Sequence, residues 1–253
     1  MIYDLQRANM LKRISAWLLD TIMLCIIATL MAFLLSAALN YDSYIARLDA
    51  RYAYYEEAYG VSRGLTQEQI DAMTPEQRSN LEAASRELSE DEEALYAYNM
   101  MIQLTIIIAS FSLLLAYLAL EHTVPLMLGN GQTIGKKIFG IGVMRQDGVR
   151  VNGVCMFIRT VLGKFAIETM IPVIVLLMLF FGSMGMVGWL IVGVIAVAQI
   201  VLLFTTKERC MIHDKLANTV TVDLASQMIF QTPEDLLKYK QKVAAQKAAS
   251  QVY

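Results

Sequence analysis

Histidine, cysteine and charge are all scarce in this chain of 253 residues. Its two histidines, His122 and His213, have no serine elbow, dinucleotide loop or metal-ligand spacing around them, so no catalytic constellation can be assembled from the sequence. The three cysteines are scattered along the chain, which excludes a disulfide framework and a cysteine-based metal site. We therefore expect no enzyme activity, no cofactor and no metal site.

Charged residues make up 17% of the chain and hydrophobic residues 57%, and the mean hydropathy is +0.48. This composition is far from that of a soluble enzyme and predicts an integral membrane protein. A bilayer core about 30 Å thick needs roughly 20 apolar residues per helix. Residues 14–39 and 100–120 each satisfy that requirement and are predicted to be single spans.

The third apolar region, 165–204, is about twice as long as one span. Gly182-Ser183-Met184-Gly185 falls near its middle, and glycine supplies the unusual dihedral angles of a helix end. We predict a tight helical hairpin formed by residues 165–181 and 186–204. The total is then four transmembrane helices.

The distribution of charge predicts how these spans are oriented, because lysine and arginine accumulate on the cytoplasmic side of membrane proteins. Three basic residues precede the first span, six lie in 121–164 and seven in the tail 205–253. The 60-residue connection 40–99 instead carries 13 acids and five bases, a net charge of −8. We expect this acidic loop outside, and both termini and the 121–164 connection in the cytoplasm.

The acidic loop has the sequence signals of a small helical cap. Thr66, Thr74 (followed by Pro75) and Ser89 each precede acidic or amide residues in the pattern of a helix start. Its tyrosines are predicted either to pack on a partner helix or to lie at the lipid headgroups. These tyrosines are Tyr41, Tyr44, Tyr52, Tyr54, Tyr55 and Tyr59.

The connection between the second and third apolar regions is rich in glycine, but it is not a phosphate-binding loop. Such a loop would need glycine at position 130 and serine or threonine at 137, where the chain has Asn130 and Lys137. Asp147-Gly148, between two β-branched stretches, predicts a short hairpin turn.

Three blocks of sequence resemble the RDD family of bacterial membrane proteins, which is named for an arginine and two aspartates. The blocks are Arg13-Ile-Ser-Ala-Trp-Leu-Leu-Asp20, then Gly131-x-Thr133-x-Gly135-Lys136-Lys137-x-x-Gly140-Ile141-x-Val143 with Asp147-Gly148 and Arg159-Thr160, and finally Arg209-x-x-x-His213-Asp214-Lys215-x-Ala217-x-Thr219-Val220. Asn218 replaces a glycine common in the last block, which bears on the turn. The acidic loop is longer than in a minimal member.

The resemblance implies a multi-pass protein of the bacterial plasma membrane. Some members of the resembled family are assigned antiport of a monovalent cation against protons. We expect an all-α membrane protein: a four-helix transmembrane bundle with a helical extracytoplasmic loop and a small cytoplasmic β-hairpin or sheet. The motif residues expected at the cytoplasmic border are Gly135, Lys136, Gly140, Arg209, His213 and Asp214.

Asp20 is the most informative single residue, because it is the one charge inside the apolar run 14–40. An ionised carboxylate at the centre of a membrane helix costs at least ~2.5 kcal/mol, so it usually faces a partner or a water-filled path. Arg13 lies nearly two turns away on the same face, about 10 Å along the axis, and cannot pair with it directly. The candidate partners are Arg159, Lys164 and Lys136.

Glu168 has a similar shallow depth in the third span, while Glu121, His122 and Gln199 lie at the cytoplasmic ends of the second and fourth. Carboxylates gathered in one leaflet are what a cation or proton site needs. Asp20 and Glu168 would then be the carriers, with Arg13 and Arg159 beside the pathway.

A purely structural role is the alternative for each of these acids. Asp20 would accept hydrogen bonds from Arg159 or from backbone amides near Gly135. Asp214 would cap a turn or pair with Arg209 or Lys215. Glu168 would pair with Lys164, which lies four residues earlier.

Two functional hypotheses follow. The first is a cation/proton antiporter that works as an oligomer, most simply a homodimer, because four spans without an internal repeat are few for a transporter. The second is a non-transporting scaffold or accessory subunit, which docks a membrane or extracytoplasmic protein through its outer loop and cytoplasmic face. Lipid is the expected surrounding in both, and no nucleic-acid partner is expected.

Overall fold

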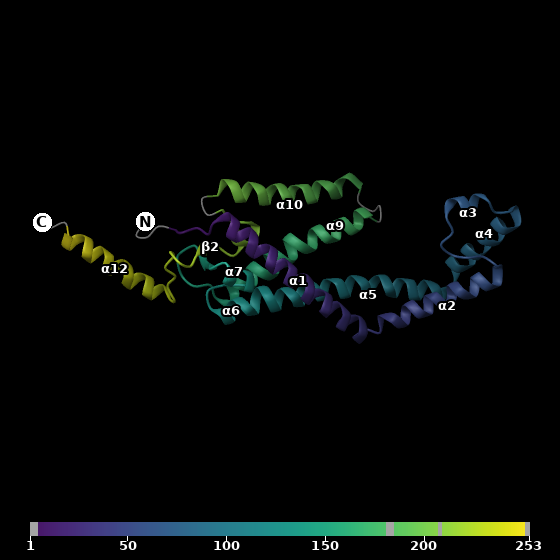
Figure 1. The fold of residues 1–253 in the computed structure, drawn as a ribbon, viewed down its shortest axis with the longest axis horizontal. Helices are drawn as coiled ribbons and strands as arrows, with labels where there is room; N and C mark the ends of the chain where they lie inside the picture. Colours follow the sequence, from purple (N-terminus) through teal and green to yellow (C-terminus); the bar gives the residue numbers. More distant parts are fainter. Residues whose placement is uncertain (1–4, 181–184, 207–208, 251–253) are drawn as a thin grey trace. The chain divides into compact units, whose positions relative to one another are not determined.

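The computed structural model describes residues 5–180, 185–206 and 209–250, and most of them are helical (Figure 1). In chain order the elements are α1 (Met10–Ala38), α2 (Tyr41–Tyr59), α3 (Gln67–Asp71), α4 (Pro75–Glu90), α5 (Glu92–Tyr117), the π-helix η1 (Leu118–Thr123), α6 (Val124–Leu128), α7 (Ile134–Ile138), β1 (Ile141–Arg145), α8 (Gly153–Phe157), the π-helix η2 (Ile158–Met170), α9 (Ile171–Phe180), α10 (Gly185–Thr205), α11 (Ile212–Leu216), β2 (Thr219–Asp223) and α12 (Pro233–Ser250). The strands β1 and β2 form one antiparallel sheet.

Within the described residues, three helical stretches are long and apolar enough to cross a membrane: Met10–Ala38, Glu92–Leu128 and Gly185–Thr205. They contain most or all of the predicted spans 14–39, 100–120 and 186–204. The predicted span 165–181 coincides instead with the end of η2 and with α9, which are helical but are not among these three.

The predicted hairpin turn falls on Gly182-Ser183-Met184-Gly185, of which the first three residues lie outside the described residues and Gly185 begins α10. The helices on either side of it do pack together. A Cβ atom added to Gly188 of α10 would lie 2.7 Å from Cγ of Leu179 in α9. This absence of a side chain at Gly188 allows the close approach that tight helix packing in membranes uses.

The chain divides into two compact units. We call residues 1–28 and 113–253 the motif unit, because the three sequence blocks lie in it, and residues 29–112 the loop unit. Each is described separately below.

The loop unit contains α2, α3 and α4, as its helix-start signals predicted. Thr66 and Thr74 each form a capping box, in which the threonine hydroxyl accepts from the amide three residues later and a glutamine side chain reaches back. The prediction at Ser89 was wrong, because Ser89 lies in the last turn of α4 and donates to the carbonyl of Arg86. Asp91 is the cap of α5 instead, accepting a 2.8 Å hydrogen bond from the amide of Ala94.

Several loop tyrosines pack against other side chains of the loop unit. Tyr55 is buried, and its hydroxyl donates to Asp91 over 3.0 Å. The rings of Tyr44 and Tyr96 lie 6.2 Å apart, and the hydroxyls of Tyr41 and Thr105 are 3.0 Å apart. Packing on a partner helix, one of the two predicted roles, is therefore confirmed for these tyrosines.

The sheet of the motif unit joins two distant parts of the chain. Ile141 is opposite Asp223 and Arg145 is opposite Thr219. Asp147-Gly148 does form the predicted turn, with the amide of Gly148 donating to the carbonyl of Arg145 over 3.0 Å. However, across this turn β1 forms an isolated bridge, between Met144 and Arg150. The strand that pairs with β1 along its length is β2. The sheet is thus closed by the C-terminal block.

The two π-helices hold four charged side chains of the candidate site, Glu121 on η1 and Arg159, Lys164 and Glu168 on η2. Their hydrogen bonds join residues five apart: the amide of Val124 donates to the carbonyl of Ala119, and the amide of Ile171 donates to the carbonyl of Ala166. In an α-helix, residues five and nine apart point in very different directions, whereas a π-helix stacks them on nearly one face. The winding of η2 therefore places Arg159, Lys164 and Glu168 along the same side.

Candidate functional site

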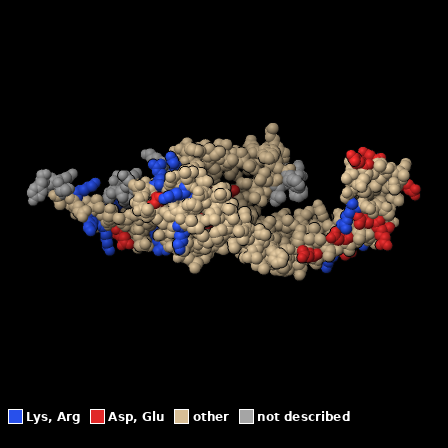
Figure 2. Space-filling view, in the orientation of Figure 1, with Lys and Arg blue, Asp and Glu red and all other residues tan. Residues whose placement is uncertain are grey.

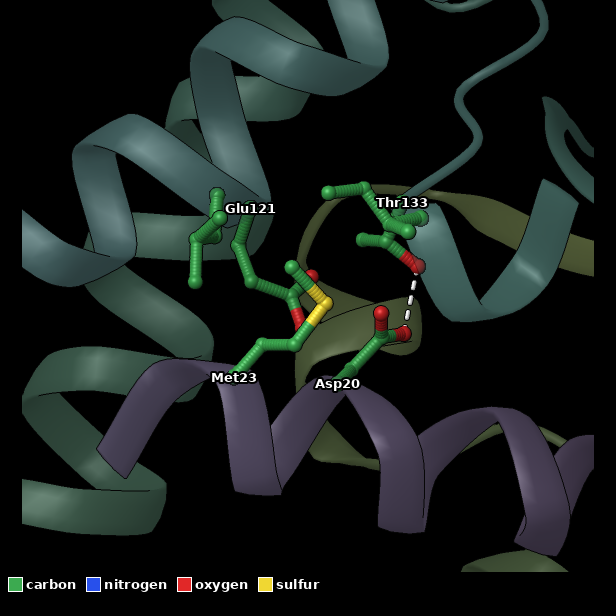
Figure 3. Close-up of a pocket in the computed structure, with 6 residues that line it drawn as sticks. Asp20, Met23, Glu121 and Thr133 are labelled. Carbon is green, nitrogen blue, oxygen red and sulfur yellow. Dashed lines mark hydrogen bonds between the residues drawn. The ribbon is translucent and has the colours of Figure 1, made fainter. Parts of the chain in front are cut away.

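Asp20 on α1 is held by the start of α7. Its carboxylate accepts hydrogen bonds from the hydroxyl of Thr133 and, over 2.8 Å, from the amide of Gly135. Lys136 Nζ lies 3.7 Å from Asp20 Oδ2, and both side chains are 11% exposed. Figure 3 shows Asp20 rising from α1 toward Thr133, with Glu121 and Met23 beside it. The predicted alternative for Asp20, a bond to the amides near Gly135, is therefore present.

Gly135 is required for this contact because α1 and α7 approach so closely there. A Cβ atom at this position would lie 2.5 Å from the carbonyl oxygen of Ala16 and 2.8 Å from Asp20 Oδ1. Such distances are shorter than real Cβ contacts, so any larger residue would push α7 away from α1. The glycine of the central motif is thus explained by helix packing against Asp20.

Glu121, on η1, is the second carboxylate of the site. Its Oε1 atom lies 2.5 Å from Lys164 Nζ, and its Oε2 atom lies 3.9 Å from Lys136 Nζ. Lys136 also donates to the hydroxyl of Thr133 over 3.1 Å. Its ammonium thus lies among oxygens of Asp20, Glu121 and Thr133, and the two lysines balance the two carboxylates. We call Asp20, Glu121, Lys136 and Lys164 the Asp20 cluster.

A small cavity of about 10 Å³ opens beside this cluster, lined by Asp20, Met23, Leu120, Glu121, Thr133 and Ile134. That volume is about enough for one water molecule. The carboxylates of Asp20 and Glu121 and the hydroxyl of Thr133 give it a set of oxygen donors. The cavity has the size to hold one water molecule or one dehydrated monovalent cation.

The environment of Lys136 makes loss of its proton easier than in water. Burial disfavours the ammonium and lowers the pKa of Lys136 to about 8, although the nearby carboxylates of Glu121 and Asp20 oppose the change. A lysine in this state can titrate near neutral pH, which an exposed lysine does not do.

Arg159 and Asp214 form a second, deeply buried cluster. Arg159 Nη1 donates to Asp214 Oδ1 over 2.6 Å, and it also donates to the hydroxyl of Thr219 over 3.1 Å. Arg13 Nη2 lies 3.9 Å from Asp214 Oδ2. Burial alone would raise the pKa of Asp214, but the positive charge of Arg159, with that of Arg13, holds it well below its ordinary value.

His213 and Glu168 adjoin this second cluster. His213 Nδ1 lies 2.8 Å from Glu168 Oε2, and the amide of His213 donates to Glu168 Oε1 over 2.9 Å. Burial lowers the pKa of His213, against the opposing effect of the Asp214 carboxylate. We call Arg159, Asp214, Arg13, His213 and Glu168 the Asp214 cluster.

The sequence predictions are partly corrected by these contacts. Of the three candidate partners of Asp20, Lys136 is the one that forms an ion pair with it, whereas Arg159 pairs with Asp214 and Lys164 with Glu121. The predicted pair of Glu168 with Lys164 was wrong for the same reason. Asp214 also closes the first turn of α11, accepting from the amide of Met211 over 3.4 Å. Its ion-pair partners among the described residues are Arg159 and Arg13, with His213 Nε2 3.6 Å away, and not Arg209 or Lys215.

Three other residues of the family blocks, Arg209, Gly140 and Asn218, lie in turns of the backbone. Arg209 has a positive φ of 49°, and its carbonyl accepts a 2.8 Å hydrogen bond from Arg13. Gly140, with a φ of 66°, makes the turn from α7 into β1. Asn218, the departure from the family pattern, has a φ of 52° in the turn between α11 and β2. Asparagine tolerates this left-handed conformation better than most residues, so the departure preserves the turn.

Two members of the site had no predicted role in it: Glu121 was grouped with the polar side chains of one leaflet but not predicted to carry an ion, and Thr133 was noted as a motif residue alone. The sequence does mark Glu121 as a candidate, because it is a charged residue directly after the second apolar run, 100–120. Thr133 is visible as the threonine of the central motif. Their convergence with Asp20 depends on the π-winding of η1 and on the position of α7, neither of which has a signature in the sequence.

Several apolar helices, a small sheet and two buried charge clusters define a multi-pass membrane protein. Its family follows from the sequence, because the RDD family model matches residues 7–218, and the chain belongs to that family. The matched residues include all but the last two positions of the C-terminal block. No curated protein and no solved structure matches the chain.

Proposed function

We propose that this RDD family protein exchanges a monovalent cation for a proton at the Asp20 cluster. The observation that carries the proposal is the meeting of two carboxylates, Asp20 and Glu121, with the hydroxyl of Thr133 at a cavity the size of one water molecule. Carboxylate and hydroxyl oxygens are ligands of hard cations. Acidic side chains at membrane depth are typical of ion and proton paths.

The position of Lys136 supports coupling between the two ions. Its ammonium lies 3.1 Å from Thr133 Oγ1, 3.7 Å from Asp20 and 3.9 Å from Glu121, and so occupies the place of a bound monovalent cation. A cation entering the cavity would compete with this ammonium for the same oxygens. Because two carboxylates and two lysines already balance, arrival of the cation favours release of one proton.

The wider architecture that we propose has four spans, both termini in the cytoplasm of a bacterial cell and at least two copies of the chain. The helical stretch 165–180 packs against α10 through Leu179 and Gly188, as a fourth span would. The excess of basic residues outside the acidic loop supports the orientation. A cavity for one ion is too small to form a pathway by itself, which supports a dimer that completes it.

Proton flux in proteoliposomes tests the proposal directly. Purified protein would be reconstituted with an internal pH dye, and Na⁺, K⁺ or Li⁺ gradients imposed. We expect cation-dependent flux in the wild type, and its loss in Asp20→Asn and Glu121→Gln. Asp223→Asn is the matched control, because Asp223 pairs with Lys12 at the edge of the sheet, outside the Asp20 cluster. Absence of flux from monodisperse, reconstituted wild type would refute antiport.

One observation favours the second hypothesis, a scaffold or accessory subunit. Asp20, Glu121, Glu168 and Asp214 all have hydrogen-bond or ion-pair partners in the structure. Buried charges that are fully paired can serve the fold alone. Under this hypothesis Asp20→Asn would reduce the yield of folded protein, and wild type would give no flux under any gradient.

A further inference from the structure

The loop unit has a groove of its own, between α2, α4 and the segment that joins α2 to α3. Its volume is about 300 Å³, which is at the lower end of the range for binding sites. Its apolar lining comes from Val61, Leu65, Ile70, Leu81 and Leu88, all of them only partly buried, and from the rings of Tyr52 and Tyr55. The groove therefore leaves several apolar side chains uncovered in the highly charged segment 40–99, which carries 13 acids and five bases.

The walls of the groove are fixed before any partner arrives. The capping boxes of Thr66 and Thr74 start α3 and α4, and Tyr55 is tied to Asp91. Arg63 ties the joining segment to α2 by ion pairs, at 2.7 Å with Asp49 and at 3.5 Å with Glu56. A groove with such walls can bind without first ordering its own chain, which lowers the cost of association.

The charges around the groove point to the kind of partner it fits. Arg63 lines the groove, but its guanidinium is already shared between Asp49 and Glu56, so it is poorly placed to attract an anion. The segment 40–99 that forms these helices has a net charge of −8, and Figure 2 shows acidic side chains over this part of the chain. A surface of this kind attracts a positively charged partner and repels an acidic one.

We propose that this groove binds a basic, amphipathic segment of another protein, with apolar side chains in the groove and lysine or arginine over the acidic surface. Helical segments dock in this way, through apolar residues spaced three and four apart. The proposal does not depend on ion exchange at the Asp20 cluster. It identifies the loop as an interaction surface and gives the charge and pattern of its partner.

A pair of tryptophan substitutions on α4 isolates the groove. Ser85 lines it and is exposed, and its hydroxyl donates to the carbonyl of Leu81 in the same helix. Ser85→Trp therefore fills the groove with a large ring and leaves the charge unchanged. Ser79 is exposed on the same helix and does not line the groove, so Ser79→Trp is the matched control.

The experiment uses the full chain in lipid nanodiscs and a displayed library of random 12-residue peptides. Peptides are selected for binding to wild type and to Ser79→Trp, and selected against binding to Ser85→Trp. Synthetic versions of the enriched peptides are then measured by fluorescence anisotropy at low and high salt. Versions with each lysine and arginine replaced by glutamate are measured beside them.

We expect enriched peptides that are basic and carry apolar residues at helical spacing. Their affinity should fall at least tenfold on Ser85→Trp, stay unchanged on Ser79→Trp, and fall with salt and with charge reversal. Enrichment of uncharged or acidic peptides would overturn the proposed partner chemistry. Failure to obtain any peptide that distinguishes Ser85→Trp from Ser79→Trp would overturn the groove as a docking site.

Discussion

The two units of the chain each contain an arginine–aspartate pair, and the pairs differ in their surroundings. In the motif unit the side chains of Arg159 and Asp214 are 3% and 1% exposed. In the loop unit those of Arg51 and Asp91 are 27% and 7% exposed. The first pair keeps two charges together away from water, whereas the second leaves its arginine in partial contact with solvent.

The neighbours of the two aspartates show what each pair does. Asp214 lies beside two arginines from separate segments, Arg159 and Arg13, and its loss would leave Arg159 buried without its charge partner. Asp91 caps α5, and its hydrogen bond to the Ala94 amide is the leading cause that lowers the pKa of Asp91. The same type of ion pair thus joins remote segments in the motif unit and caps the start of a helix in the loop unit.

Arg159→Met should give the largest effect, because it removes the charge partner of buried Asp214. Breaking a buried pair from one side costs ~3–5 kcal/mol, so we expect a large loss of unfolding free energy in denaturant titrations. Arg51→Met in the loop unit is the control and should change far less. Equal losses in the two variants would contradict the difference between the pairs.

Gly135→Ala tests how tightly α7 packs on α1 in the motif unit. Its Cβ would clash with the carbonyl of Ala16 and with Asp20, so we expect a loss of about 1–3 kcal/mol, as for other overpacked sites. In Gly193→Ala the new Cβ meets nothing within 4 Å, and alanine favours the helix. That control should be neutral or slightly stabilising. A neutral Gly135→Ala would show that the contact with α1 is loose.

Asp91→Ala should cost about 1 kcal/mol, the usual loss for a helix cap. Asp91→Ser separates capping from charge, because serine can accept from the Ala94 amide but cannot pair with Arg51. If capping dominates, Asp91→Ser should retain most of the stability in thermal unfolding. A serine variant as unstable as the alanine variant would instead make the ion pair the main contribution in the loop unit.

The smallest expected change is in the titration of Lys136. Its ammonium should lose its proton as pH rises through about 8, which NMR of ¹³C-dimethylated lysine can follow. Glu121 and Asp20 both favour the charged form, Glu121 more strongly. Glu121→Gln should therefore lower the pKa of Lys136 further, and Asp20→Asn should lower it less. A rise in either variant would contradict this arrangement of charges.

Local features of the fold could be predicted from the sequence. The capping boxes at Thr66 and Thr74 involve residues only three positions apart, so their chemistry is visible in a short window. The turn at Asp147-Gly148 and the apolar spans are visible for the same reason. Even here competition between neighbours matters, since Asp91 caps the helix that Ser89 was expected to start.

The partners of the buried charges could be predicted only in part. The bond from the Gly135 amide to Asp20 was one of the predicted alternatives, because the family blocks placed both residues at the same membrane border. The choice of Arg159 for Asp214 and of Lys164 for Glu121 depends on the winding of η2. The rare π-winding has no signature in this sequence. A prediction that assumes α-helical spacing therefore assigns these residues to the wrong faces of the helix.

The pairing of β1 with β2 also determines the order of events during synthesis of the protein. Residues 141–145 leave the ribosome well before residues 219–223, and α10 is made between them. Arg159 likewise appears 55 residues before Asp214, its charge partner. The motif unit therefore stays open, with an uncompensated arginine, until almost the whole chain has been translated. A nascent chain stopped before residue 214 would expose this arginine and the unpaired β1 edge to quality control.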